Sequence, residues 1–421
     1  MTIHLSRFFF FFFLSILPLK ASYILIPMDE DAQKNHLKAY GIAFWTLEND
    51  LTVDWLLNYR GGSFLIENHS KIEKECIIRG VSYEIITDSY KNELKIQLAH
   101  PEQNTDVVKL EKAPKVAVYS PKGNFPWDDA VTMALTYAEI PYDVIYDKEI
   151  LSDLLPSYDW LHLHHEDFTG QYGKFYKHFK NAPWYREQKR NFEADALAMG
   201  YTKVAEQKLD VALKIKEFLA GGGFLFAMCS ATDSYDIALA AEGVDICEHM
   251  FDGDPMNPSA QQLLDFDKSI AFKDFQIIKS PNIYEFSDID VTRSRKVNKN
   301  EDFFTLFEFS AKWDPVPTML CQNHKQIIKG FMGQTTAYKK SRLKPNVLIM
   351  GENKGAGEAK YIHGTLGKGM WTFYGGHDPE DYQHRVGDPP TELELHPNSP
   401  GYRLILNNIL FPAAKKKKQK T

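Results

Sequence analysis

The chain has 421 residues, of which 44% are hydrophobic and 25% are charged, a composition typical of a globular protein with one large or two modest domains. Its formal net charge of −7 argues against a nucleic-acid partner, because neutralising phosphates requires clustered Lys and Arg. The basic run KKKKQK, in residues 413–421, is interpreted as a solvated tail.

Residues 1–21 have the pattern of a secretory signal peptide. A weakly basic start leads into the apolar run FFFFFFLSIL, which ends at small residues. This run is too short to span a bilayer, which takes about 20 apolar residues. We therefore expect cleavage near Ala21 or Ser22, a periplasmic or secreted protein, and no membrane span after cleavage. A retained N-terminal anchor is the alternative.

Residues 22–112 are predicted to form a small α/β unit. The segment YILIPM (23–28) has the pattern of a strand, and residues 30–47 have helical spacing. The segments VDWLLNY (53–59) and SFLI (63–66) flank an Arg-Gly-Gly turn and predict a pair of strands.

Residues 113–412 are predicted to form the main domain. The segments 115–120, 142–147, 159–165 and 221–228 are short apolar strands, and helical patterns lie between them. This alternation predicts a flavodoxin-like three-layer α/β domain with a parallel sheet, beside the smaller N-terminal α/β unit. Towards the end, residues 360–376 predict a hairpin and residues 399–411 a closing helix.

Polar clusters follow three of these strands. His164, His165 and Glu166 follow the third strand, Cys229 the fourth, and a GGHDPED segment the last. Ligands of open parallel sheets bind at the carboxyl ends of the strands. We therefore predict a substrate-binding loop at 164–166, and we assign Asp233, in the helix after Cys229, to the same set.

The segment HLHHEDF (162–168) also has side chains that suit a metal ion. Adjacent strand residues point to opposite faces, so His164 and His165 are not expected to turn inward together, whereas His162 and His164 share a face. Polar contact with the substrate is therefore predicted instead, and no metal or cofactor is expected.

Cys229 has two interpretations. At a sharp strand-to-helix turn, an imidazole and a helix N-terminus would both favour a nucleophilic thiolate. Alternatively, it is a small buried hydrophobe. The nucleophile hypothesis predicts a free thiol that is not paired with Cys247 and that reacts fastest among the four cysteines.

The segments KEFLAGGGFLFAMCSATD and GKGMWTFYGGHDPEDYQ resemble the class I glutamine-amidotransferase-like superfamily, especially its trehalose-utilisation-type branch. The resemblance covers residues 113–412. It implies Cys229 as nucleophile, His377 as base, and Glu380 or Asp378 as the orienting carboxylate. The sequence departs from the superfamily pattern because alanines replace both elbow glycines and Glu380 stands three residues after His377. The trehalose-utilisation-type branch also includes members without the nucleophile.

The whole chain also resembles exported bacterial proteins named asparagine synthetase B. The motifs do not support that activity, since Thr2 stands where such enzymes carry a cysteine and the glycine-rich pyrophosphate loop is missing. The favoured prediction is an exported Cys-dependent hydrolase acting on an amide or glycan-linked small molecule. The alternative is a non-catalytic domain that binds carbohydrate or a protein partner.

Overall fold

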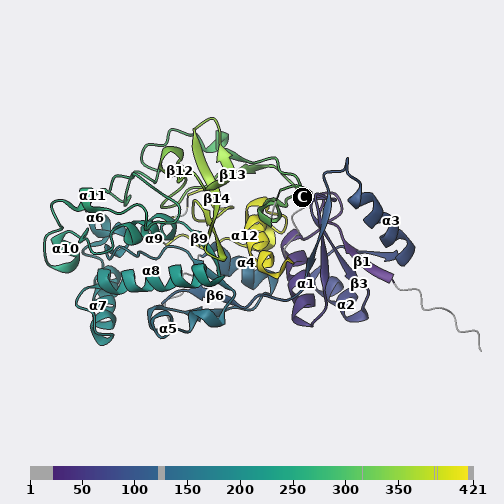
Figure 1. Ribbon diagram of the computed structural model, residues 1–421, viewed down its shortest axis with the longest axis horizontal. Coiled ribbons are helices and arrows are strands. Elements are labelled where there is room, and N and C mark those ends of the chain that lie inside the picture. Colours follow the sequence, from purple (N-terminus) through teal and green to yellow (C-terminus); the bar gives the residue numbers. More distant parts are fainter. Residues whose placement is uncertain (1–21, 122–128, 315, 384, 386, 416–421) are drawn as a thin grey trace, which may run out of the picture.

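The computed structural model describes residues 22–121, 129–314, 316–383, 385 and 387–415. The expected signal peptide and most of the basic tail therefore lie outside the described residues. Two β-sheets organise the chain, one built from residues 22–110 and the other from residues 116–374 (Figure 1).

The N-terminal sheet has five strands in the order β4-β1-β3-β2-β5, and every neighbouring pair is antiparallel. Helix α1 packs on one face and α3 on the other. Asn35 caps α1 by accepting the amide of Lys38. The bounds are β1 Ser22–Ile26, α1 His36–Glu48, β2 Val53–Leu57, β3 Ser63–Glu67, α2 Ser70–Arg79, β4 Glu84–Thr87, α3 Asp88–Ala99 and β5 Asp106–Leu110.

The second sheet has ten strands in the order β11-β10-β13-β14-β15-β9-β8-β6-β7, with β12 paired to β14. The strands from β15 to β7 are parallel, and those from β11 to β15 are antiparallel. The bounds are β6 Val116–Tyr119, β7 Asp143–Ile145, β8 Trp160–Leu163, β9 Phe224–Met228, β10 Phe303–Leu306, β11 Ile327–Lys329, β12 Tyr338–Lys339, β13 Leu348–Asn353, β14 Glu358–Leu366 and β15 Gly369–Tyr374.

The predicted flavodoxin-like parallel sheet is therefore wrong. Strands β14 and β15 form a hairpin that turns between Leu366 and Gly369, and two strands joined by so short a turn can only be antiparallel. The predicted hairpin is present and belongs to the main sheet. β15 is parallel to β9 on its other side, so it joins the two halves of a mixed sheet.

Helices cover both faces of the ten-stranded sheet. Alternate residues of β6 show this, because Val116 and Val118 pack with α4 and α12, whereas Ala117 and Tyr119 pack with α8 and α9. The bounds are α4 Ala130–Ala138, α5 Asp147–Leu151, α6 Tyr176–Phe179, α7 Pro183–Ala198, α8 Val204–Gly221, α9 Ala231–Ala240, α10 His249–Asp252, α11 Ala260–Leu263 and α12 Pro400–Leu410. Within the described residues, no helix is both long enough and apolar enough to cross a membrane.

A buried carboxylate organises the irregular region after α9. Asp236 accepts the backbone amides of Ile270, Ala271 and Phe272, each at 2.8 Å. Because a buried amide without a partner is costly, these three bonds allow a segment without regular structure to pack against the sheet.

The two sheets are joined through α1, α4 and α12, which contact one another between them (Figure 1). The close approach of α1 to α4 requires Gly41, because a Cβ there would lie 1.9 Å from the carbonyl oxygen of Ala138. Arg403 of α12 is fully buried and donates to Tyr40 Oη at 2.9 Å, to the carbonyl of Met28 at 3.2 Å, and to the carbonyl of Gly61.

Candidate functional site

The site begins with Asp129, the N-cap of α4. Its carboxylate accepts the amides of Val131 at 2.7 Å and Thr132 at 3.1 Å, and it lies 3.1 Å from Nε2 of His162 and 3.3 Å from Nδ1 of His164. Burial would raise the pKa of this carboxyl, but the two histidines outweigh burial and hold the pKa well below its usual value. Asp129 is therefore a buried, ionised carboxylate.

His162 faces a hydrogen-bond acceptor on each side of its ring. Nδ1 lies 3.1 Å from the carbonyl oxygen of Phe226 and Nε2 lies 3.1 Å from the carboxylate of Asp129. Since neither oxygen can donate, both contacts are satisfied only when both ring nitrogens carry protons. Both histidines contact Asp129, but His162 lies within β8, whereas His164 follows the last residue of that strand.

Three imidazoles converge beyond the ends of β8 and β15. One ring nitrogen each of His164, His165 and His377 lies within 4.8 Å of the other two. The rings of His164 and His377 have centroids 4.6 Å apart, and those of His165 and His377 stack at 6.2 Å. His164 and His377 are buried, and His165 is the most exposed of the three.

His164 is buried and His165 is exposed, which agrees with the expectation that the two do not turn inward together, yet their ring nitrogens lie within 4.8 Å of each other. Strand β8 ends at Leu163, so the two histidines lie in the loop after it and the alternation of strand side chains no longer applies to them. The expectation that His162 and His164 share a face is confirmed, because both contact Asp129.

Cys229 occupies a strained turn between β9 and α9. Its φ is +50°, a left-handed conformation that is uncommon for a residue other than glycine. Its amide donates to the carbonyl of Gly376 at 3.2 Å, and the amide of Ala231 donates to the carbonyl of His164 at 3.0 Å. The backbone geometry is thus that of a nucleophile elbow, a strained strand-to-helix turn.

The thiol of Cys229 does not have the environment of a nucleophile. The residue is only 3% exposed, and burial raises the pKa of the thiol to about 12. The amides of Ser230 and Gln334 lower the pKa, while the carboxylates of Asp233 and Asp290 raise it further. The expected pairing of this thiol with His377 stays a prediction. All four cysteines are free thiols, as expected for Cys229 and Cys247.

The two carboxylates expected to orient His377 make other contacts. Glu380 lies 3.3 Å from Nδ1 of His396, and Asp378 accepts the amides of Glu380 at 2.8 Å and Asp381 at 3.3 Å. Asp378 also interacts with the hydroxyl of Tyr402. These contacts shape the loop after β15, and the orienting role of the two carboxylates stays a prediction.

Of the remaining two predicted site residues, only Glu166 contacts the histidine cluster. Glu166 accepts the amide of His164 at 3.0 Å and so shapes the loop that carries the histidines. Asp233 is fully buried and accepts the hydroxyl of Thr335 at 2.7 Å. Burial and the nearby Asp290 raise the pKa of Asp233 well above its usual value, which suits a packed, protonated carboxyl better than a substrate contact.

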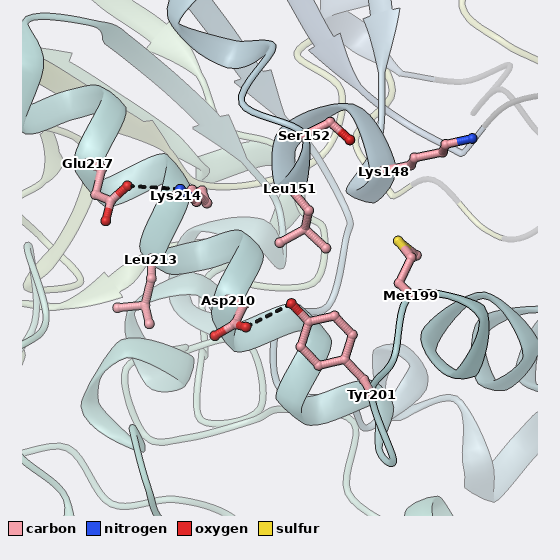
Figure 2. A pocket seen from close by; sticks show the side chains of 9 residues that line it. All are labelled: Lys148, Leu151, Ser152, Met199, Tyr201, Asp210, Leu213, Lys214 and Glu217. Atoms are coloured by element: carbon pink, nitrogen blue, oxygen red, sulfur yellow. Dashed lines mark hydrogen bonds and ion pairs between the residues drawn. The ribbon is translucent and has the colours of Figure 1, made fainter.

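The hollow in Figure 2 shares no residue with the histidine cluster. It has a volume of about 560 Å³ and is formed by α5, α8 and the segment between α7 and α8. Among its lining residues, the hydroxyl of Tyr201 donates a hydrogen bond to the carboxylate of Asp210 at 2.7 Å. It is lined by Lys148, Leu151, Ser152, Met199, Tyr201, Asp210, Leu213, Lys214 and Glu217.

The comparisons with known proteins give only distant structural similarity. The cytoplasmic protein STM3548 from Salmonella typhimurium aligns with a TM-score of 0.34 at 10% identity, covering 72% of this chain and 100% of that chain. The cytoplasmic protein STM1381 from Salmonella typhimurium LT2 aligns with a TM-score of 0.32 at 12% identity, covering 71% of this chain and 99% of that chain. A beta-galactosidase from Bacillus circulans sp. alkalophilus aligns with a TM-score of 0.26 at 11% identity, covering 68% of this chain and 31% of that chain. No family model and no curated protein matches the chain.

Proposed function

We propose that the protein is a hydrolase of an amide or glycan-linked small molecule whose catalytic centre is the histidine cluster of His164, His165 and His377. One observation carries the proposal: imidazoles from two separate strand ends converge within 4.8 Å, with an ionised carboxylate behind one of them. The substrate class comes from the resemblance of residues 113–412 to the amidotransferase-like superfamily.

In the proposed reaction, His164 is the general base. The carboxylate of Asp129 lies 3.3 Å from Nδ1 of His164, which orients the ring and leaves Nε2 to take a proton from an attacking water. The water oxygen bonds to the carbonyl or anomeric carbon, the C–N or C–O bond breaks, and the leaving group receives the proton. His165 and His377 are placed to donate to the oxygen that gains negative charge.

The test is a panel of chromogenic amides and glycosides assayed with the purified protein. We expect His164→Ala and His377→Ala to lower kcat/KM by at least about 100-fold, the scale of general acid–base catalysis. His100→Ala is the control, because this exposed histidine lies in the N-terminal part of the chain. Wild-type turnover in both cluster variants would overturn the proposal. Measurable binding without turnover would favour the non-catalytic binding domain.

The Cys-dependent amidotransferase-like reaction is a second candidate, favoured by the positive φ of Cys229 at the elbow. There, His377 would take the thiol proton and the thiolate would attack the carbonyl carbon of an amide. The C–N bond would break, the leaving amine would receive the proton from His377, and water would then hydrolyse the thioester and restore the thiol. The same assay separates the two candidates, because Cys229→Ala abolishes that reaction and His164→Ala does not. We also propose that the protein acts outside the cytoplasm, on the pattern of residues 1–21.

A further inference from the structure

The three imidazoles that follow the ends of β8 and β15 are also side chains that commonly bind metal ions. We propose that His164, His165 and His377 bind one Zn²⁺ ion and that Asp129 holds His164 from behind. The inference deepens the proposed function and rests on its location of the centre. Three histidines with one open coordination position are a recurring ligand set of catalytic zinc.

The spacing suits this ion after a small closure. With Zn–N distances of about 2.0–2.1 Å, ligand nitrogens in a tetrahedral site lie roughly 3.4 Å apart. The three nitrogens already lie within 4.8 Å of one another. His165 is the most exposed of the three and follows the end of β8, so its side chain has room to turn towards the two buried rings.

Asp129 supplies the outer contact that zinc-bound histidines normally make. Its carboxylate lies 3.3 Å from Nδ1 of His164, which assigns the ligand role to Nε2. The carboxylate is itself held by the amides of Val131 and Thr132 and by His162. The His164 ring is therefore oriented before any ion arrives.

Zinc would change the proposed chemistry in one respect. Nε2 of His164 would be a ligand and no longer the base, and the fourth position would hold a water. Zinc lowers the pKa of such a water to about 7, so the metal-bound hydroxide would be the nucleophile. His162, whose two nitrogens face Phe226 and Asp129, would stay outside the coordination sphere.

A second group of candidate ligands, Asp245, Cys247 and Asp252, is already satisfied. Nζ of Lys203 lies 2.7 Å from Asp245 and 2.9 Å from Asp252, so an ammonium ion stands where a cation would bind. Burial raises the pKa of the Cys247 thiol, which donates to the carbonyl of Thr169 at 3.1 Å. A protonated thiol is a poor zinc ligand. This group therefore provides the matched control.

The experiment measures metal binding directly. The purified full chain is stripped with a chelator and titrated with Zn²⁺ alone by calorimetry, and Co²⁺ is added in parallel to read its tetrahedral absorption bands. We expect one equivalent of zinc. His164→Ala and His377→Ala should weaken binding at least about 100-fold, and Asp129→Asn about 10–100-fold without removing a ligand. His100→Ala and Cys247→Ser should bind as wild type does.

Circular dichroism confirms that each variant is folded before its titration. The proposal is overturned if wild type takes up no zinc at micromolar concentration, or if zinc binding survives both cluster substitutions. Since the readout is binding, the two proposals fail separately. Loss of turnover in the histidine variants with no zinc uptake leaves the metal-free mechanism. Zinc uptake without turnover on the substrate panel removes the hydrolase.

Discussion

The amide nitrogen of Cys229 donates a hydrogen bond to the carbonyl oxygen of Gly376 at 3.2 Å. Gly376 immediately precedes His377, and two residues after Cys229 the amide of Ala231 bonds to the carbonyl of His164. One turn therefore holds both loops that carry the buried histidines of the cluster. The backbone of the turn at Cys229 therefore helps to position the histidine cluster, and this role does not depend on the reactivity of the thiol.

The left-handed conformation at Cys229 predicts an unusual order of stability for two variants at this position. Valine is larger and more apolar than alanine, yet Cys229→Val should be less stable than Cys229→Ala by about 1–2 kcal/mol, because a β-branched side chain is strained at φ +50°. Urea unfolding of the two variants measures the difference. Cys321 is also buried but is not among the residues with positive φ, so Cys321→Val should not show this inversion. A valine variant at 229 as stable as the alanine variant would contradict the strain.

Gly41→Ala should destabilise the protein although alanine is the better helix former. The new Cβ would lie 1.9 Å from the backbone oxygen of Ala138, and the resulting displacement of α1 from α4 should cost about 1–3 kcal/mol. Gly221, at the end of α8, is the control because nothing lies within 4 Å of its Cβ position. Gly221→Ala should be neutral or stabilise by up to about 1 kcal/mol. Equal thermal midpoints for the two variants would refute the close contact.

Stability should fall with acid because of a stacked histidine pair. The rings of His36 and His324 lie 4.2 Å apart, and burial together with Arg403 lowers their pKa values to about 4 and about 2. The contribution of the two histidines to the free energy of unfolding is complete above their unfolded pKa of about 6.5. It is lost as the pH falls from there towards 4, because the unfolded chain binds protons that the folded chain does not. Urea midpoints between pH 8 and pH 4 should show this decline.

The matched variant for that titration is His324→Gln, which removes one of the two depressed groups. Its midpoint should decline less between pH 6.5 and pH 4 than that of the wild type. An identical pH dependence in the two proteins would show that other groups account for the acid sensitivity.

The proposed export predicts a defined start for the mature protein. Residues 1–21 should be removed, so that N-terminal sequencing of the exported chain begins near Ala21 or Ser22, where β1 starts. An intact Met1 on protein recovered from a membrane fraction would instead support the retained anchor.

Local sequence patterns predicted the elements better than their assembly. The hairpin at 360–376 and the closing helix at 399–411 correspond to β14, β15 and α12. The mixed sheet was not predicted, because hydrophobic runs mark a strand without showing which edge it joins. The pairing of β15 with β9 depends on contacts more than 140 residues apart in the chain.

The site shows the same limit. Backbone proximity brings Cys229 next to the loop of His377. The groups that act on its thiol include Gln334 and Asp290, which are far from Cys229 in the chain and which the local pattern around Cys229 does not describe. Asp129 was not predicted as a site residue, because an acidic residue at the start of a helix is common without any functional role. Its contacts with His162 and His164 join the N-cap of α4 to β8 and the loop after it, a relationship between segments that the sequence does not show.

The buried guanidinium of Arg403 means that the N-terminal part of the chain cannot complete its hydrogen bonds until the C-terminal helix has been synthesised. Its acceptors, the carbonyls of Met28 and Gly61, are separated from it by 375 and 342 residues. The N-terminal sheet therefore leaves the ribosome long before the side chain that satisfies these two carbonyls. Contacts this distant in the chain slow folding, so the early part must wait in an incomplete state until α12 is made. A chain truncated before residue 400 should consequently lose order at its other end.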